Sequence, residues 1–292
     1  MAQLQAGLAF TPRRYTNIPA VKLAEKLVEI TPEQLTRVLF CPGGSEAIEM
    51  AISLAKYITG RWKTVSYWDS YHVNGFQSIS AGGEEHFSGG LGPLMPGAYH
   101  LEFPNYYRNP WNLTDMEAID DLYIRSLEIL LKRNPDIAAI IAEPISATPV
   151  VPSEDYWKRI REICDQYGIF LIFDEIIEGF GRIGKWFACE HYVTPDVLVL
   201  GKSLGGGILP LAGIVTREEY NVLQHRSIGH FTHEKNPLSA AAGLAGIEYI
   251  EKNGLVQNSE NLGNYLLERL LALQNQFPVI GHVAGRGTAP GN

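Results

Sequence analysis

An aspartate and a lysine stand at the ends of two predicted strands, where both side chains could act on a bound ligand. Asp174 ends the apolar run 169–174, and Lys202 directly follows the run 196–201. Ligands of open α/β sheets gather outside the carboxyl ends of strands. A carboxylate there can pair with a protonated heterocyclic nitrogen, and a partly desolvated lysine amine can attack an aldehyde.

Both residues also have ordinary interpretations. Asp174 could cap a loop or pair with Arg182, and Lys202 could be a solvated surface lysine, which is the commonest fate of lysine. For Asp174 the motif alone leaves the choice open. For Lys202 the neighbours favour chemistry, because Gly201 precedes it and the glycines of 205–207 follow it.

A glycine-rich turn offers a third kind of group. In FCPGGSEAIEMA (40–51) a predicted strand ends, two glycines follow, and a helix begins near Ser45. Glycines let backbone amides approach a ligand, and a helix N-terminus carries unpaired N–H groups that bind phosphate. Taken alone, this motif is more typical of a plain strand-to-helix turn.

The elements that would position these residues alternate along the chain. Short runs rich in Val and Ile are separated by stretches of helical period, which is typical of βαβ units. The expected fold class is therefore α/β, with a mostly parallel sheet flanked by helices. The stretch 82–111 has no clear period and is expected to be an extended functional loop. The predicted strands are 36–40, 63–68, 137–143, 169–174, 196–201 and 211–216, and the predicted helices are 45–60, 115–133, 153–168, 238–254 and 258–277.

Composition excludes several classes of function. The 24 basic and 32 acidic residues give a formal charge of −8, which argues against a surface for nucleic acid. No apolar run is long enough for a membrane span, and the N-terminus lacks the pattern of a secretory signal, so a cytoplasmic location is expected. The three cysteines have no zinc-ligand spacing.

A series of short motifs follows the glycine-rich turn in a definite order: YH (71–72), EP (143–144), FDE (173–175), GFGR (179–182), PD (195–196), GK (201–202), GGG (205–207) and THEKNP (232–237). In order and approximate spacing this pattern resembles the class III aminotransferases, which use pyridoxal 5'-phosphate (PLP) and have PLP fold type I. The resemblance covers about residues 20 to 280. It implies the large domain of that fold and a PLP cofactor.

The resemblance also implies how the cofactor would be held. Gly44 and Ser45 would bind its phosphate. Tyr71 would stack on one face of the pyridine ring, and Ile176 would pack on the other. From the residues alone, Tyr71 could instead be a core aromatic.

Four further roles come from the same resemblance. Asp174 would bind the ring nitrogen, and Lys202 would form the Schiff base with the cofactor. Thr232 would reach the phosphate in the neighbouring subunit, which implies a homodimer or a larger assembly with the active site at the interface. Glu143 would lie near the substrate. Without the resemblance, Thr232 could be a cap close to a helix.

The function that the resemblance implies is PLP-dependent transfer of an amino group between a primary amine or amino acid and a keto acid or aldehyde. Two alternatives remain: an ammonia-lyase or phospho-lyase of the same family, or a truncated cofactor-binding core with impaired catalysis. The second alternative arises because family members extend beyond both ends of this chain. The expected domains are a PLP-binding large domain, 1–277, and the start of a truncated small domain, 278–292. Val73 departs from the family, which commonly has glycine there.

Overall fold

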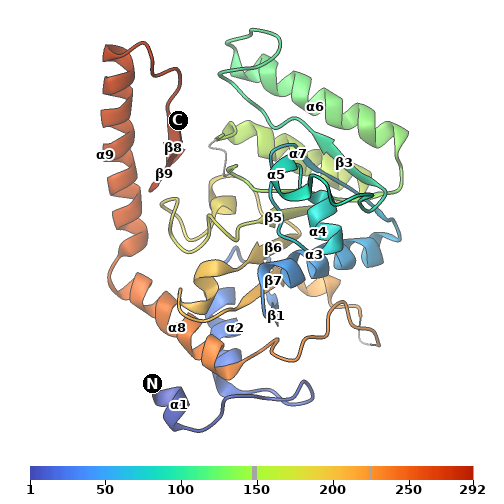
Figure 1. Ribbon diagram of the computed structural model, residues 1–292, viewed down its shortest axis with the longest axis vertical. Helices are drawn as coiled ribbons and strands as arrows, with labels where there is room; N and C mark the ends of the chain where they lie inside the picture. The colour runs from blue at the N-terminus through green and yellow to red at the C-terminus, as the bar shows by residue number, and fades with distance from the viewer. Residues whose placement is uncertain (147–149, 224, 292) are drawn as a thin grey trace.

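A seven-stranded sheet forms the centre of the computed structural model, which describes residues 1–146, 150–223 and 225–291 (Figure 1). Its strands are β1 (Arg37–Cys41), β2 (Lys63–Tyr67), β3 (Ala98–Leu101), β4 (Ile137–Ala142), β5 (Phe170–Asp174), β6 (Val197–Leu200) and β7 (Ala212–Thr216). Their order across the sheet is β1-β7-β6-β5-β4-β2-β3. Only the two pairings of β7, with β1 and β6, are antiparallel. The expected mostly parallel α/β fold is confirmed.

The six predicted strands all occur, each within one residue of its predicted ends. The prediction of a loop over 82–111 was incomplete, because β3 lies within that stretch. β3 is short, lies at the edge of the sheet and pairs with β2 alone. Its four side chains are only half-buried, so it has none of the continuous apolar character of the central strands.

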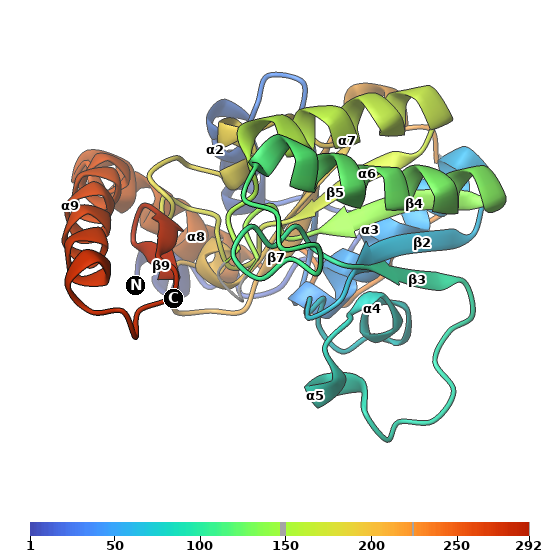
Figure 2. The ribbon, with the colours of Figure 1, turned by 90° about the horizontal axis from the view of Figure 1, so that it is seen from above.

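The helices cover both faces of the sheet. Figure 2 shows α6 and α7 side by side over one face, with α3 on the other. The predicted helices correspond to α3, α6, α7, α8 and α9, whereas α1, α2, α4 and α5 were not predicted. The α-helices are α1 (Ala2–Gln5), α2 (Ile18–Ile30), α3 (Gly44–Thr59), α4 (Phe76–Ala81), α5 (Glu85–Ser88), α6 (Met116–Arg133), α7 (Glu154–Tyr167), α8 (Pro237–Lys252) and α9 (Leu255–Gln276), and short 3-10 turns span Ala188–His191, Lys202–Gly205 and Glu218–Tyr220.

The core has two halves, one on each face of the sheet. Successive strand residues point to opposite faces. Ile140 and Leu171 therefore pack in the cluster that contains the apolar side chains of α2, α6 and α7, whereas Ile141 and Ile172 pack with those of α3. Because the central strands are buried on both faces, their carboxyl ends are held rigidly.

A buried carboxylate ties the beginnings of β5 and β6 together. Asp196 precedes β6, and its Oδ2 accepts hydrogen bonds from the Leu171 amide (2.8 Å) and the Arg161 guanidinium (2.7 Å). Its Oδ1 accepts one from the Tyr220 hydroxyl (2.8 Å). The relative position of the two strands that lead to Asp174 and Lys202 is thus fixed at their amino ends.

The C-terminal residues form a small antiparallel hairpin, β8 (Ala284–Arg286) with β9 (Ala289–Gly291). The hairpin packs on α9, and both views show this pair of elements beside the main sheet (Figures 1 and 2). Among the described residues, no helix combines the length and the apolar character needed to cross a membrane.

Candidate cofactor site

The carboxyl ends of three adjacent parallel strands bring three predicted site residues to one edge of the sheet. Asp174 ends β5, Glu143 follows β4, and Lys202 follows β6 after one glycine. Asp174 and Glu143 are buried. This edge is where an open α/β sheet binds its ligand.

Asp174 is bound to a histidine rather than to an arginine. Its Oδ2 lies 2.8 Å from His72 Nδ1, and its Oδ1 accepts a hydrogen bond from the Ile176 amide (3.2 Å). Because a carboxylate can only accept, Nδ1 carries the hydrogen. The alternative pairing with Arg182 is wrong, since Arg182 Nε donates to the carbonyl of Ile177. His72 is completely buried, and the sequence analysis did not place it in the site.

Ile176 lies between the glycine-rich turn and the residue before Lys202. A Cβ atom added to Gly44 would come within 3.0 Å of Ile176 Cδ1 and 3.3 Å of Val73 Cγ1. One added to Gly201 would come within 3.3 Å of Ile176 Cγ1 and Cγ2. These two glycines therefore pack closely against one buried side chain, and a larger residue at either position would force Ile176 to shift. The predicted phosphate turn and the predicted Schiff-base lysine meet at this point.

The N-terminus of α3 has the features of an anion site. Its N-cap is Gly43, which has no side chain to bind the free amides of the first turn. Ser45 lies in that turn, and its hydroxyl accepts a hydrogen bond from the Asn74 amide (3.3 Å). Free N–H groups and the positive end of the helix dipole favour a phosphate here.

Residues 71–74 connect the parts of the site described so far. Tyr71 is half-buried and is not a core aromatic, and its ring lies 4.0 Å from that of Phe87, centroid to centroid. Val73 has a φ of +64°, which is rare and strained for a β-branched residue. The glycine common at this position in the family would adopt that conformation freely. The predicted stacking of Tyr71 on a ring stays a prediction.

Lys202 differs from Asp174 in its surroundings. It is exposed, and no hydrogen bond or ion pair joins it to another described residue. Its φ of +41° lies in the left-handed region, uncommon for a residue other than glycine. The Lys202 side chain is therefore not desolvated in the single chain, although Leu204 and Gly205 of the same 3-10 turn are buried.

Thr232 is likewise exposed, and the described part of the chain supplies no hydrogen-bond partner for its hydroxyl. The alternative role as a cap of the following helix is wrong. The N-cap of α8 is Asn236, whose side chain accepts from the amides of Leu238 and Ser239. The structure does not join Thr232 to Asp174 or Lys202 by any contact within the described chain.

Two further buried carboxyl groups follow Asp174. Glu175 accepts hydrogen bonds from the amides of Ala188 (2.5 Å) and Cys189 (2.7 Å), yet burial raises its pKa to about 7. Glu178 is buried near Glu143, and burial raises its pKa well above the ordinary value. No sequence pattern pointed to Glu178, because a single glutamate in a turn is usually solvated.

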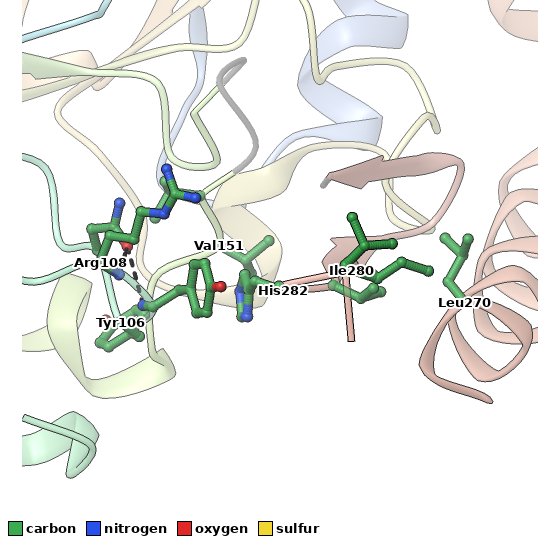
Figure 3. A pocket seen from close by; sticks show the side chains of 12 residues that line it. Tyr106, Arg108, Val151, Leu270, Ile280 and His282 are labelled. Carbon is green, nitrogen blue, oxygen red and sulfur yellow. Dashed lines mark hydrogen bonds between the residues drawn. The ribbon is translucent and has the colours of Figure 1, made fainter. Parts of the chain in front are cut away.

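A separate cavity of about 610 Å³ lies between the loop 105–108 and the segment 279–283 (Figure 3). The rings of Tyr107 and His282 stack across it, 5.4 Å apart, and Leu270 of α9 closes one side. None of the residues predicted to hold the cofactor lines this cavity. It is therefore distinct from the edge at which Asp174 and Lys202 lie.

The groups at the carboxyl edge fit PLP. An anionic phosphate suits the uncapped N-terminus of α3, a basic ring nitrogen suits the buried carboxylate of Asp174, and an electrophilic aldehyde suits the unpaired amine of Lys202. In the parts of the chain that the structure describes, no cluster of His, Cys, Asp and Glu could hold a metal ion.

Comparison with known proteins agrees with this chemistry. The model of the aminotransferase class-III family matches residues 1–291. An (R)-1-hydroxy-2-aminoethylphosphonate ammonia-lyase of Vibrio splendidus is 42% identical over 98% of the chain, and an alanine/serine racemase of Pyrococcus horikoshii is 35% identical over 92%. The chain spans 63% and 58% of the lengths of these two relatives.

Solved structures show the same likeness. An amine transaminase from an uncultivated Pseudomonas species, in a PLP-bound form, matches with a TM-score of 0.91 and 33% identity, over 98% of this chain and 69% of that one. This chain therefore has the fold of a PLP-bound transaminase, as the sequence analysis expected. Since the family model covers nearly all of the sequence, this chain belongs to the class III aminotransferase family.

Proposed function

We propose that this chain is the PLP-binding core of an enzyme that transfers an amino group between a primary amine or amino acid and a keto acid or aldehyde. The observation that carries the proposal is the packing at Ile176, which draws together the Asp174 carboxylate, the N-terminus of α3 and the turn that begins at Lys202. PLP is the cofactor of this family, and the groups at this edge suit it.

Each residue has a defined task in this proposal. The amides of Gly44 and Ser45, with the Ser45 hydroxyl, bind the phosphate. Asp174 accepts a hydrogen bond from the protonated ring nitrogen and stabilises its positive charge. His72 donates to the other side of the same carboxylate and keeps it oriented.

Tyr71 and Ile176 hold the ring between them, and Glu143 lies toward the substrate. The chemistry that bound PLP supplies is an aldehyde that takes up amines and a ring that withdraws electrons from the substrate carbon. Lys202 Nζ would hold the cofactor covalently. As a free amine, Lys202 Nζ would remove a proton from the substrate carbon as a general base and return one as a general acid.

A second outcome of the same site is elimination. It is favoured by the 42% identity to an ammonia-lyase. In this case the chain would release ammonia without needing an amino acceptor. A phospho-lyase would release phosphate in the same way, and a core with impaired catalysis would bind PLP without turnover.

We infer that the active form is a homodimer or larger, with the site at the interface. Lys202 and Thr232 are exposed in the single chain, and the apolar side chains of Ile208 and Leu209, which follow Lys202 in the sequence, are exposed as well. A second copy that covered this surface would desolvate Lys202 and bring its own Thr232 to the phosphate. The proposal of a cytoplasmic location rests on the sequence alone.

The proposed domain division places the boundary at residue 277. The large domain, 1–277, holds every proposed cofactor contact, and the hairpin within 278–292 would belong to a small domain. The packing of β8 and β9 on α9, beside the main sheet, accords with this division.

Borohydride trapping tests the proposed cofactor linkage. Reduction in the presence of PLP makes a lysine–cofactor link permanent, and peptide mapping should find it on Lys202. Lys202→Ala should abolish the adduct, whereas Lys185→Ala, at another exposed lysine, should not. An adduct on any other lysine would contradict the assignment.

Acceptor dependence tests the reaction type. A transaminase needs a keto acid or aldehyde to turn over repeatedly, and it produces the corresponding amine. Release of ammonia or phosphate without an acceptor would identify a lyase instead. PLP binding without reaction toward any amine would identify the impaired core.

A further inference from the structure

One oxygen of a buried carboxyl group beside the candidate site has no hydrogen-bond partner among the described residues. Glu178 is 3% exposed, and its Oε2 forms no hydrogen bond with any described residue. The Gly179 amide donates to the Glu175 carbonyl (3.1 Å), which closes the turn that carries Glu178 next to the end of β5. Buried polar atoms are rarely left without partners, so this atom requires an explanation.

The charges around Glu178 decide which form it takes. Its neighbours are the carboxyl groups of Glu143, Asp174 and Glu175, and each of them, after burial itself, raises the Glu178 pKa. His72 contacts this cluster through Nδ1, which is used by Asp174. Burial and these neighbouring charges therefore favour the protonated form of Glu178, whose O–H group can donate a hydrogen bond.

We propose that Glu178 is a further binding residue of the cofactor site, whose carboxyl group donates a hydrogen bond to an oxygen atom of the ligand held against Asp174. This inference rests on the proposed function. The oxygen can belong to PLP or to an acidic group of the amine substrate, because both carry acceptor oxygens.

A purely structural role accounts poorly for this residue. A buried carboxyl group that only supports the fold is expected to have partners, as Glu175 has in the amides of Ala188 and Cys189. Glu178 Oε2 is desolvated without such a partner, which costs stability. Polar groups that lack a partner until a ligand binds, and that lower the stability of the free protein, are typical of binding sites.

The test compares three variants, Glu178→Met, Glu178→Gln and Glu175→Met. Methionine removes the donor while preserving volume, glutamine keeps an N–H donor, and Glu175→Met is the matched control at a partnered carboxyl group. Apo-protein of each variant is titrated with PLP. The PLP-loaded protein is then titrated with the amine substrate. Thermal unfolding of the apo-protein is followed from pH 4.5 to 8.

We expect Glu178→Met to bind one of the two ligands about threefold to tenfold more weakly, the effect of one net hydrogen bond. Weaker PLP binding would place the acceptor on the cofactor, and weaker amine binding alone would place it on the substrate. Glu178→Gln should stay within about twofold of the parent. Apo Glu178→Met should melt at or above the parent, whereas Glu175→Met should melt below it.

The pH dependence has a definite sign. A carboxyl group with a raised folded-state pKa stabilises the fold fully below its unfolded-state value, near 4.5, and loses that contribution as the pH rises. The advantage of apo Glu178→Met over the parent should therefore grow from pH 4.5 upward.

Two results would overturn the inference: unchanged affinities for both ligands in Glu178→Met, or a loss of stability in that variant as large as in Glu175→Met. Failure of the proposed function would appear differently, as a parent chain that forms no borohydride-stable adduct with PLP.

Discussion

The two sides of the candidate site differ in their burial and in the number of contacts that the chain provides for them. The inner side, residues 71–74 and 174–178, is largely buried, and its contacts include those of His72 with Asp174 and of Ile176 with Gly44. The outer side, residues 202–209 and 231–233, is largely exposed, and neither Lys202 nor Thr232 contacts a polar partner among the described residues. The chain therefore fixes the groups that would hold a ring in place, whereas it leaves exposed the lysine that would react with the ligand.

The largest expected effect is on the inner side. Asp174→Asn should keep PLP but slow removal of the substrate proton about a hundredfold or more, because a neutral amide no longer favours the protonated ring nitrogen. Single-turnover spectroscopy with an excess of amine measures this rate. Asp165→Asn, at an exposed carboxylate of α7, is the control. An unchanged rate would remove Asp174 from the mechanism.

On the outer side, Thr232→Ala should weaken PLP binding about tenfold to a hundredfold, through loss of a hydrogen bond to a charged acceptor worth about 1.5–3 kcal/mol. The melting temperature of the apo-protein should not change, because the side chain is exposed. Thr216→Ala is a useful contrast, since that buried hydroxyl donates to the Asp196 carbonyl and its loss should lower stability.

Mixed dimers sharpen the same prediction. If Thr232 acts across an interface, a dimer of one Lys202→Ala chain and one Thr232→Ala chain contains one site with both defects and one with neither. Mixing the two inactive or weakened proteins should then restore part of the tight PLP binding and of the reaction. A monomer that binds PLP tightly would rule out the shared site.

Glu175 on the inner side should matter for stability rather than binding. In Glu175→Gln the NH₂ group cannot accept from the backbone, so either the Ala188 or the Cys189 amide loses its acceptor, at a cost of about 1–3 kcal/mol. Urea unfolding measures this cost. Because the Glu175 pKa is raised from 4.5 to about 7, the parent loses stability between these pH values and the gap between the two proteins should narrow. A stability difference between the parent and Glu175→Gln that widens as the pH rises would contradict the raised pKa of Glu175.

The smallest effect is expected at Val73, where the inner side is strained. Val73→Gly relieves an unfavourable φ of +64° but loses side-chain packing and gains unfolded-state entropy, so stability should change by less than about 1 kcal/mol. Val65→Gly in the buried strand β2 should cost more than about 3 kcal/mol. Similar losses at both positions would show that Val73 carries no strain.

Sequence periodicity was sufficient to predict the central strands and the longer helices. β4 and β5 are continuous apolar runs bounded by clear turn residues, and their ends were predicted within one residue. β3 was missed because four half-buried residues carry almost no period. The antiparallel direction of β7 was also beyond the sequence, since strand patterns do not depend on the direction of pairing.

The sequence predicted the site residues that lie in recognisable motifs. It did not predict the contacts that form only when distant segments pack together. Asp174, Lys202 and the turn at Gly44 lie next to strand ends, so their convergence follows from a parallel sheet. The contact of His72 with Asp174 joins positions 102 residues apart, and no pattern in the sequence predicts it. The exposure of Lys202 in the single chain could not be read from the sequence, because a strand end does not indicate what covers it.

The carboxylate of Asp196 has a consequence for the motions of the molecule. It accepts the Leu171 amide, while the Asp196 amide itself donates to the Leu171 carbonyl (2.8 Å), so both backbone groups of one residue are held by the residue before β6. Amide protons held in this way exchange with solvent only when the surrounding unit opens. Opening of β5 and β6 is therefore coupled at their amino ends, and thermal fluctuation moves Asp174 and the strand before Lys202 as one body.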